Sequence, residues 1–192
     1  MKGKTISDNK TTNLALTGLM AALVLIATMF FKVQIPVGGD KTMIGFANVF
    51  CVLSGMLLGP VYGGLAAGIG SALFDLMGGW ASSAPVTLVT KFAMAFLCGL
   101  IVWGGEKAEK AVSRVIAGAV TGSLAYCVLY IAYSWIKQLV LGSAWQVIQL
   151  QLSVKIPVTL LNAAIADVIA VPLFFAVRSA LKHSGLTSIM RV

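Results

Sequence analysis

Two ionisable residues, Asp75 and Lys91, interrupt otherwise apolar stretches and are the side chains best placed to do chemistry. Only the short bend from Gly78 to Pro85 separates those two stretches. A charge in a bilayer costs roughly 2.5–3.5 kcal/mol on insertion scales unless it is paired or faces a hydrated cavity. We therefore interpret both residues as lining a pocket for a polar ligand. The alternative is a structural ion pair, in which each charge neutralises the other.

The composition indicates an integral membrane protein. The chain of 192 residues is 59% hydrophobic and 10% charged, and its mean hydropathy is +0.96. Windows of about 20 residues predict an all-α membrane protein: a single domain, residues 1–192, made of one bundle of six transmembrane helices. The predicted spans are Asn13–Phe31, Met43–Leu58, Val61–Met77, Pro85–Trp103, Val112–Ile136 and Ser153–Val177.

The placement of lysine and arginine predicts the orientation. Basic residues gather before the first span, around the loop after the fourth span, and after the sixth. With six spans all three groups fall on one side, which the positive-inside rule assigns to the cytoplasm, together with both termini. This topology accounts for the net charge of +8, and no soluble basic face remains for nucleic acid. The groups are Lys2, Lys4 and Lys10; Lys107, Lys110 and Arg114; Arg178, Lys182 and Arg191.

No motif for catalysis or metal binding accompanies the spans. Cys51, Cys98 and Cys127 lie within them without a CxxC pair or a nearby histidine, so we expect them to act as small hydrophobic residues. The chain has no nucleophile motif, zinc motif or ATP-binding loop. We therefore expect neither an enzyme nor a bound cofactor or metal. Transport driven by ATP would need another subunit.

Polar residues on several predicted spans share one depth. Counted at 1.5 Å per residue, Asn48, Asp75, Thr87 and Lys91 all lie within a few turns of the outer surface, and Asn162 lies somewhat deeper. Because these residues come from four different helices, they predict a substrate-binding pocket in the outer third of the bundle.

Aromatic side chains near this level are candidates for stacking on a planar ligand. Tyr130 and Trp80 are the residues we select, although Trp80 also suits an interfacial aromatic belt. Two further charged residues, Lys155 and Asp167, have other interpretations than ligand binding. Lys155 would snorkel to the headgroups. Asp167, near mid-membrane, would form a proton or sodium site or a hydrogen bond to a serine or threonine.

Small residues mark two helices as packing surfaces. On the first helix, Thr17 with Ala21 and Gly18 with Ala22 form two small-xxx-small rows, which allow close helix approach in lipid. The partner is either this bundle or another protein, and Gly18 and Ala22 are our candidates for a protein interface. Between residues 59 and 72, small side chains recur every four residues in two rows, which predicts a helix buried between neighbours.

Three stretches together resemble a known family. Residues 57–64 (LLGPVYGG), 68–76 (GIGSALFDL) and 84–91 (APVTLVTK) are similar to the second-to-fourth helices of substrate-binding S components of energy-coupling-factor (ECF) vitamin transporters. Ile156-Pro157 with Asn162, and the later Pro172-Leu173, resemble the last helix. The stretch Gly18–Ala22 resembles the AxxxA coupling motif, with Gly replacing the first Ala.

The resemblance implies a subunit in the bacterial plasma membrane that captures a small heterocyclic vitamin or precursor. It implies a transmembrane coupling protein and two cytoplasmic ATPase subunits as partners, and a bundle that topples to release substrate inward. Within the family we favour a vitamin B6 vitamer or a thiamine-precursor pyrimidine over riboflavin or a queuosine precursor. Ala47-Asn48 departs from the Gly-Asp of many relatives, which leaves the substrate open.

Two hypotheses of other classes remain. An autonomous ion-coupled secondary transporter would use Asp75, Lys91 and Asp167 as a relay and would need no partner. A structural or assembly subunit would bind no ligand, which the clustered polar residues disfavour.

Overall fold

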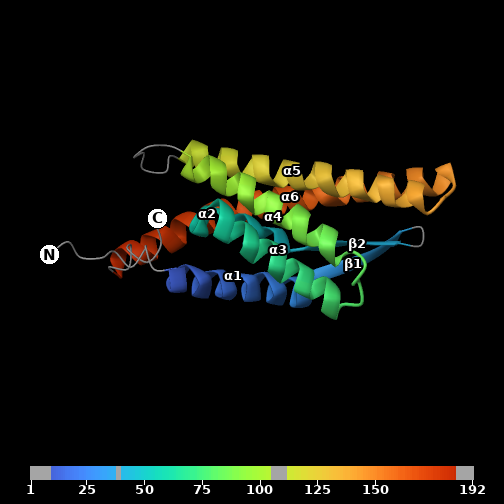
Figure 1. Cartoon of the computed structure of the whole chain (residues 1–192). Coiled ribbons are helices and arrows are strands. Elements are labelled where there is room, and N and C mark those ends of the chain that lie inside the picture. Colours follow the sequence, from blue (N-terminus) through green and yellow to red (C-terminus); the bar gives the residue numbers. More distant parts are fainter. Residues whose placement is uncertain (1–9, 38–39, 105–111, 185–192) are drawn as a thin grey trace.

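The computed structural model describes residues 10–37, 40–104 and 112–184. These residues form six helices and one two-stranded sheet. The helices lie side by side in an elongated bundle, and the sheet lies at one end of it, which we call the hairpin end (Figure 1). The elements are α1 Lys10–Phe30, β1 Lys32–Val37, β2 Asp40–Gly45, α2 Ala47–Leu58, α3 Pro60–Met77, α4 Ala84–Trp103, α5 Val112–Val140 and α6 Trp145–His183.

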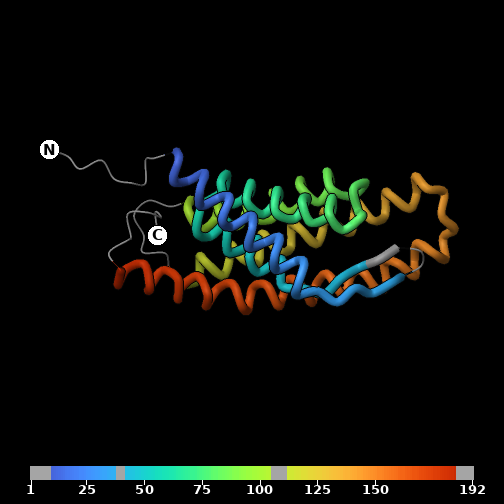
Figure 2. The backbone as a smooth tube through the Cα atoms, turned by 90° about the horizontal axis from the view of Figure 1, so that it is seen from below, coloured from blue at the N-terminus to red at the C-terminus, as the bar shows by residue number. Residues whose placement is uncertain are grey.

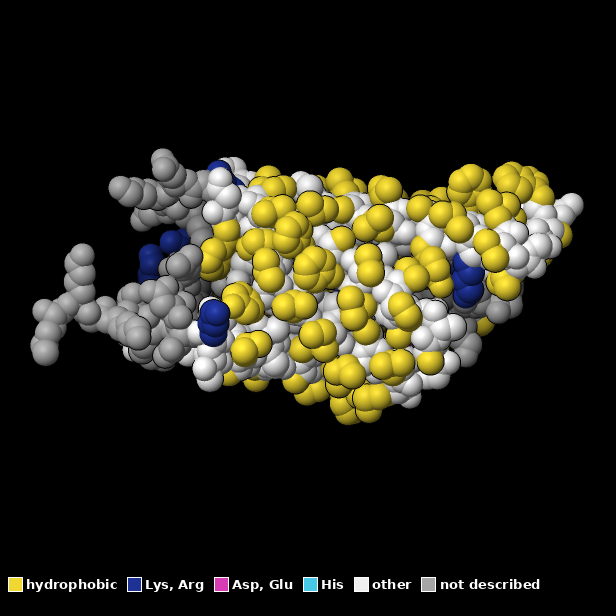
Figure 3. Space-filling model, in the orientation of Figure 1, with side chains coloured by type: hydrophobic (Ala, Val, Ile, Leu, Met, Phe, Trp, Pro, Cys, Tyr) yellow, Lys and Arg dark blue, Asp and Glu magenta, His cyan; other side chains and the backbone are white. Residues whose placement is uncertain are grey.

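The surface and the helix lengths are those of a membrane protein. Among the described helices, α1, α4, α5 and α6 are long and apolar enough to cross a membrane. Large apolar side chains cover the visible face between basic side chains near its two ends (Figure 3). Lipid accommodates such a surface, whereas water does not. The predicted class, a helical membrane protein, is confirmed. The number of crossings and the side on which the termini lie stay predictions.

The second predicted span differs from the structure at its start. We placed it from Met43, but α2 begins at Ala47 and has 12 residues. The preceding residues form β2, which pairs antiparallel with β1 from Lys32 opposite Gly45 to Val37 opposite Asp40. Apolar residues alternate in β1, and two glycines separate the strands, a pattern typical of a hairpin. A window for membrane spans does not detect this period-two pattern.

The last two helices are longer than their predicted spans. α5 continues to Val140, and α6 runs for 39 residues with Pro157 and Pro172 inside it. At the hairpin end both helices project beyond α1 to α4 (Figure 1). Proline is tolerated within a membrane helix because neighbouring groups satisfy the freed backbone carbonyls. The predicted boundaries marked the most apolar windows. α5 continues past its predicted end because no glycine or proline follows Ile136 until Gly142, and α6 begins soon after that glycine.

Small residues let α3 pack closely against three helices, α1, α2 and α4. A Cβ on Gly63 would clash with the backbone of α2 at Ser54 and Gly55, and one on Gly70 would clash with the carbonyl of Ala21 on α1. Gly59 forms the tight turn between α2 and α3, because its φ of +81° is a conformation that glycine adopts readily. The predicted buried helix is therefore present, and glycine is what permits the close approach.

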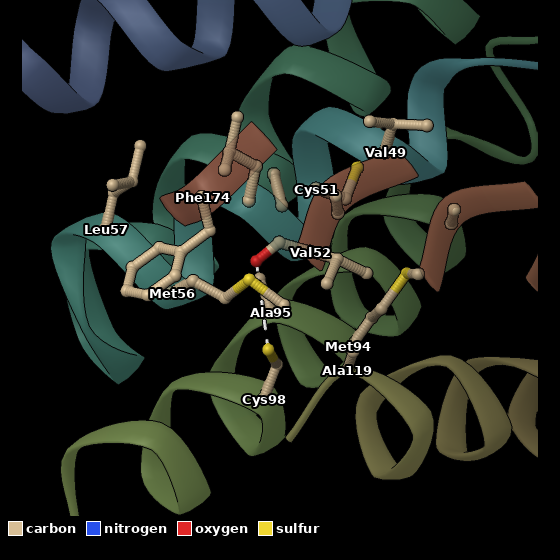
Figure 4. Close-up of a cluster of buried hydrophobic side chains, with 14 of the residues drawn as sticks. Val49, Cys51, Val52, Met56, Leu57, Met94, Ala95, Cys98, Ala119 and Phe174 are labelled. Carbon is tan, nitrogen blue, oxygen red and sulfur yellow. Dashed lines mark hydrogen bonds between the residues drawn. The ribbon is translucent and has the colours of Figure 1, made fainter. Parts of the chain in front are cut away.

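An apolar core takes side chains from all six described helices, and Figure 4 shows the part of it between α2, α4, α5 and α6. Met56, Met94 and Phe174 are among its fully buried side chains. Two of the three cysteines belong to this cluster, and Cys98 points its Sγ toward the Val52 carbonyl oxygen at 3.8 Å. All three cysteines are buried and free, as expected of small hydrophobic residues.

The start of α1 and the end of α6 lie at the end of the bundle opposite the hairpin (Figures 1 and 2). An even number of crossings brings the two ends of a chain to one side of a membrane. Of the basic residues that predict the orientation, Lys2, Lys4, Lys107, Lys110 and Arg191 lie outside the described residues.

Candidate substrate-binding site

One cavity at the hairpin end gathers the residues that the sequence singled out. Its volume is about 110 Å³, several times the roughly 10–15 Å³ that one buried water needs on the same measure. All seven candidate binding residues line it, and they come from α2 to α6 and the loop after α3. They are Asn48, Asp75, Trp80, Thr87, Lys91, Tyr130 and Asn162. The structure thus brings the predicted set together, and its role in binding stays a prediction.

Helical periodicity explains how α5 contributes to this wall. Tyr126, Tyr130, Tyr133 and Lys137 follow one another at spacings of four, three and four residues, and all four line the cavity. Residues at these spacings share one face of a helix. Of these four residues only Tyr130 was predicted from the sequence as a binding residue, although their spacing identifies one face of the helix.

The α6 wall follows the same rule. Lys155, Thr159 and Asn162 are four and three residues apart and all line the cavity. Only Asn162 was predicted from the sequence as a binding residue. The predicted span began at Ser153, which placed Lys155 near its end and within reach of the headgroups. Since α6 begins at Trp145, ten residues before Lys155, this whole face lies inside the bundle.

Lys91 makes its closest contacts with neutral groups. The side chain is 7% exposed, and its Nζ donates a hydrogen bond to Asn48 Oδ1. The same Nζ lies 3.8 Å from the centroid of the Tyr126 ring. An amide oxygen and the face of an aromatic ring both attract an ammonium group. Lys91 and Asp75, both among the described residues, form no direct ion pair. The structure therefore does not contain the structural ion pair that was the alternative to a ligand pocket.

Asp75 lies in the last turn of α3 and is 3% exposed. The Thr87 side chain of α4 lies beside its carboxylate, and both residues line the cavity. The Asp75 carbonyl also accepts a bond from the Trp80 N–H at 2.8 Å, which folds the loop after α3 back over the cavity. Asp75 and Lys91 therefore face the same cavity from two helices, and Lys91 donates its hydrogen bond to Asn48 rather than to Asp75.

Asn162 holds the hairpin through both ends of its amide. Its Oδ1 accepts a hydrogen bond from the Gly45 N–H at 3.0 Å, and its Nδ2 donates to the Met43 carbonyl at 2.7 Å. Because β2 also lines the cavity, Asn162 positions one wall of the site. From its depth in the sequence this residue was predicted to bind substrate, directly or through one water, and the hairpin that it holds was not predicted.

The aromatic side chains on the cavity wall suit a planar ligand. Tyr126 and Tyr130 are stacked, with centroids 5.7 Å apart and planes inclined by 22°. Trp80 and Phe74 line the wall as well. Aromatic faces pair favourably with other π systems, so the arrangement offers a ring-binding surface next to hydrogen-bonding groups.

Lys155 belongs to a buried polar network that the sequence did not reveal. It is 2% exposed, and its Nζ donates to Ser134 Oγ at 2.7 Å and to Gln151 Oε1 at 3.3 Å. Gln138 Nε2 donates to Gln151 Oε1 at 2.9 Å. The expectation that Lys155 snorkels to the headgroups is wrong, because hydrogen-bond acceptors inside the α5–α6 pair hold its ammonium group.

Asp167 is not among the residues that line the cavity. Its Oδ1 accepts a hydrogen bond from Ser123 Oγ at 2.7 Å. Of the two expectations for this carboxylate, the bond to a serine is the one the structure contains. Within the described part of the chain, no group of three metal-ligating side chains is close enough to hold a metal ion.

A bundle of apolar helices with a polar cavity between them defines a multi-pass membrane protein with a small-molecule site. The family model described as "ECF-type riboflavin transporter, S component" matches residues 8–179, so the chain belongs to this family of ECF transporter S components. S components bind a vitamin-type substrate and work with a membrane component and ATPases. The family is one of transporter subunits, not of enzymes.

A relative from Pyrococcus woesei is similar over part of the chain. It is 32% identical over 113 residues, which cover 59% of this chain and 72% of the relative. Its description is "Uncharacterized protein in gap 3'region". This similarity supports shared ancestry and names no ligand.

Proposed function

We propose that this protein is the substrate-capture subunit of an ATP-driven importer in the cell membrane, and that it takes up a small heterocyclic vitamin or precursor. The observation that carries the proposal is the cavity at the hairpin end. Seven residues chosen from the sequence, on five helices and one loop, all line it. In a member of the S-component family, such a cavity is the natural place for substrate.

The proposed topology is a single domain of six crossings with both termini in the cytoplasm. It is supported by the common location of the start of α1 and the end of α6 and by the basic residues predicted on that side. The hairpin end then faces the outside, where a capture subunit meets its substrate. The plasma membrane is the proposed location.

The proposed ligand is a planar nitrogen heterocycle with hydroxyl or amino groups. The stacked pair of Tyr126 and Tyr130 supports the ring, and Asn48 and Asp75 supply polar partners on the wall. A vitamin B6 vitamer or a thiamine-precursor pyrimidine fits this chemistry. The description of the matching family favours riboflavin as the second candidate.

The partners are a transmembrane coupling protein and two cytoplasmic ATPase subunits. The face of α1 that carries Gly18 and Ala22 is exposed, whereas Thr17 and Ala21 are buried against the bundle. A Cβ added to Gly18 would meet no atom within 4 Å. We assign the exposed row to the coupling protein, because small side chains permit close helix packing in lipid.

Ligand titration tests the binding site. The purified protein in detergent is titrated with pyridoxine, an aminomethylpyrimidine and riboflavin while its tryptophan fluorescence is followed. Mass spectrometry of co-purified small molecules identifies a retained ligand. We expect tight binding of one heterocycle, weakened by roughly 1–3 kcal/mol in Thr87→Val because a buried polar partner is then left unpaired. Tight binding of only a non-aromatic ligand, or wild-type affinity in both Thr87→Val and Lys91→Ala, would contradict the assigned site.

Reconstitution in liposomes separates the importer from a secondary transporter. Uptake by an importer subunit requires the coupling proteins and ATP. An autonomous ion-coupled carrier would instead accumulate the ligand in protein-only liposomes under a proton or sodium gradient, and that result would refute the proposed function.

A further inference from the structure

The cavity wall carries an excess of positive charge. Among the described residues that line it, four are lysines and one is an aspartate: Lys32, Lys91, Lys137, Lys155 and Asp75. The lysines come from the hairpin, α4, α5 and α6, so they reach the cavity from several sides. Positive groups that converge on a water-poor cleft attract an anion and raise its local concentration.

Lys91 is the lysine whose surroundings point most clearly to a bound anion. It is buried, and its Nζ has the Asn48 amide oxygen and the Tyr126 ring as its contacts. These groups orient an ammonium group, but neither carries a negative charge. Buried charges in proteins are generally paired with an opposite charge. The Asp75 carboxylate lies on the same cavity wall and its charge acts on Lys91, but the two side chains form no direct ion pair. The cavity is therefore where an oxyanion would contact the ammonium group directly.

Lys32 repeats this arrangement on the hairpin side. Its Nζ lies 3.9 Å from the centroid of the Phe74 ring, and the side chain is partly exposed. Two lysines on the wall, one on the hairpin and one on α4, thus rest on aromatic faces. An aromatic face holds an ammonium group in position and leaves its N–H groups free to donate to an oxyanion.

We infer that the substrate carries an oxyanion, either a carboxylate or a phosphate, and that Lys91 is the principal residue that binds it. This inference rests on the proposed function, because it assumes that the cavity is the substrate site, and it adds the charge of the ligand. Asp75, on the neighbouring helix, binds a hydroxyl or N–H donor of the same ligand. A cationic aminomethylpyrimidine is then the least favoured heterocycle.

Matched ligand pairs test this inference in the purified full-length protein. The pairs are pyridoxine with pyridoxine 5′-phosphate, pyridoxine with 4-pyridoxate, and riboflavin with its 5′-phosphate. Each pair keeps the ring and changes the charge, and the first two pairs distinguish a phosphate from a carboxylate. In at least one pair we expect the anion to bind about tenfold or more tightly than its neutral counterpart, because charge-assisted hydrogen bonds are stronger than neutral ones.

Two variants assign the effect to Lys91. In Lys91→Gln the preference for the anion should fall toward one, since the amide keeps a donor but loses the charge. In Lys91→Arg, which keeps the charge, the preference should persist. Salt gives an independent readout on the wild-type protein: raising sodium chloride from about 50 to about 500 mM should weaken binding of the anion and leave the neutral member unchanged.

Three outcomes overturn the inference. If the neutral member binds as tightly as the anion in every pair, the proposed function stands and the oxyanion is refuted. If the anion preference survives in a folded Lys91→Gln protein, Lys91 is not the principal anchor. If no member of any pair binds, the proposed vitamin site fails and the inference fails with it.

Discussion

At the scale of single residues, Asn162 connects the helical bundle to the hairpin. Its side chain accepts a hydrogen bond from the Gly45 N–H and donates one to the Met43 carbonyl. Both partners belong to β2, which is more than 100 residues away in the sequence. A residue with this role controls the shape of the cavity wall whether or not it touches the ligand.

Replacing Asn162 with Leu should loosen the hairpin. Two hydrogen bonds are lost, each worth about 0.5–1.5 kcal/mol, while the side-chain volume is nearly kept. We expect ligand binding to weaken about tenfold or more and the amide of Gly45 to exchange hydrogen faster, as measured by mass spectrometry. Leu160→Ala, at an exposed position of the same helix, is the control. Unchanged exchange at β2 in Asn162→Leu would show that other contacts hold the hairpin.

Ser134 is one of the hydrogen-bond acceptors of Lys155, the buried lysine between α5 and α6. Ser134 is buried, and its bond from Lys155, at 2.7 Å, is shorter than the one that Gln151 accepts, at 3.3 Å. Ser134→Ala should lower the free energy of unfolding by about 1.5–3 kcal/mol, the range for hydrogen bonds to charged groups. Ser153→Ala removes an exposed serine hydrogen bond from α6 and should have little effect. Equal stability of the two variants in a detergent unfolding titration would mean that Lys155 finds another acceptor.

At the scale of elements, the tight packing of α3 should make the same substitution costly in one helix and harmless in another. A Cβ on Gly63 would meet the α2 backbone, whereas a Cβ on Gly18 would meet no atom within 4 Å. Gly63→Ala should lower the free energy of unfolding by about 1–3 kcal/mol through overpacking. Gly18→Ala should be neutral or slightly stabilising, since alanine favours a helix. If both variants unfold alike in detergent, α3 does not pack as closely as its glycines indicate.

The elements differ in how well sequence reasoning predicts them. Helices α3 and α4 begin and end close to their predicted limits, because Pro60 and Pro85 suit a first helical turn and the glycine-containing loops stop the helices. The hairpin was missed because its strands are six residues each and adjoin apolar helices, so a window of helix length averages over them. The alternation in Val33, Ile35 and Val37 was the available signal.

At the scale of the whole molecule, the face of α1 with Gly18 and Ala22 should couple capture to transport. Gly18→Trp adds a large side chain to an open surface of the solitary subunit, in the middle of α1 and away from the cavity. We expect wild-type ligand affinity in titration, but loss of co-purification with the coupling protein and of ATP-driven uptake in liposomes. The control is Val168→Trp, at a 73% exposed position on α6, which should assemble normally. A Gly18→Trp protein that assembles and transports would place the partner elsewhere, and one that loses binding would show that this face packs within the bundle.

The sequence by itself determined the class of protein, the main helices and seven of the residues on the cavity wall. Hydropathy and charge are sums over local stretches, and polar residues at a common depth are unfavourable in lipid unless they meet, so Asn48, Asp75 and Lys91 could be grouped without coordinates. Only the tertiary structure decided which groups bond to each other. That Lys91 turns to Asn48 and Tyr126 rather than to Asp75, and that Asn162 holds a hairpin, depends on helix rotation and on backbone groups distant in sequence, which no local pattern encodes.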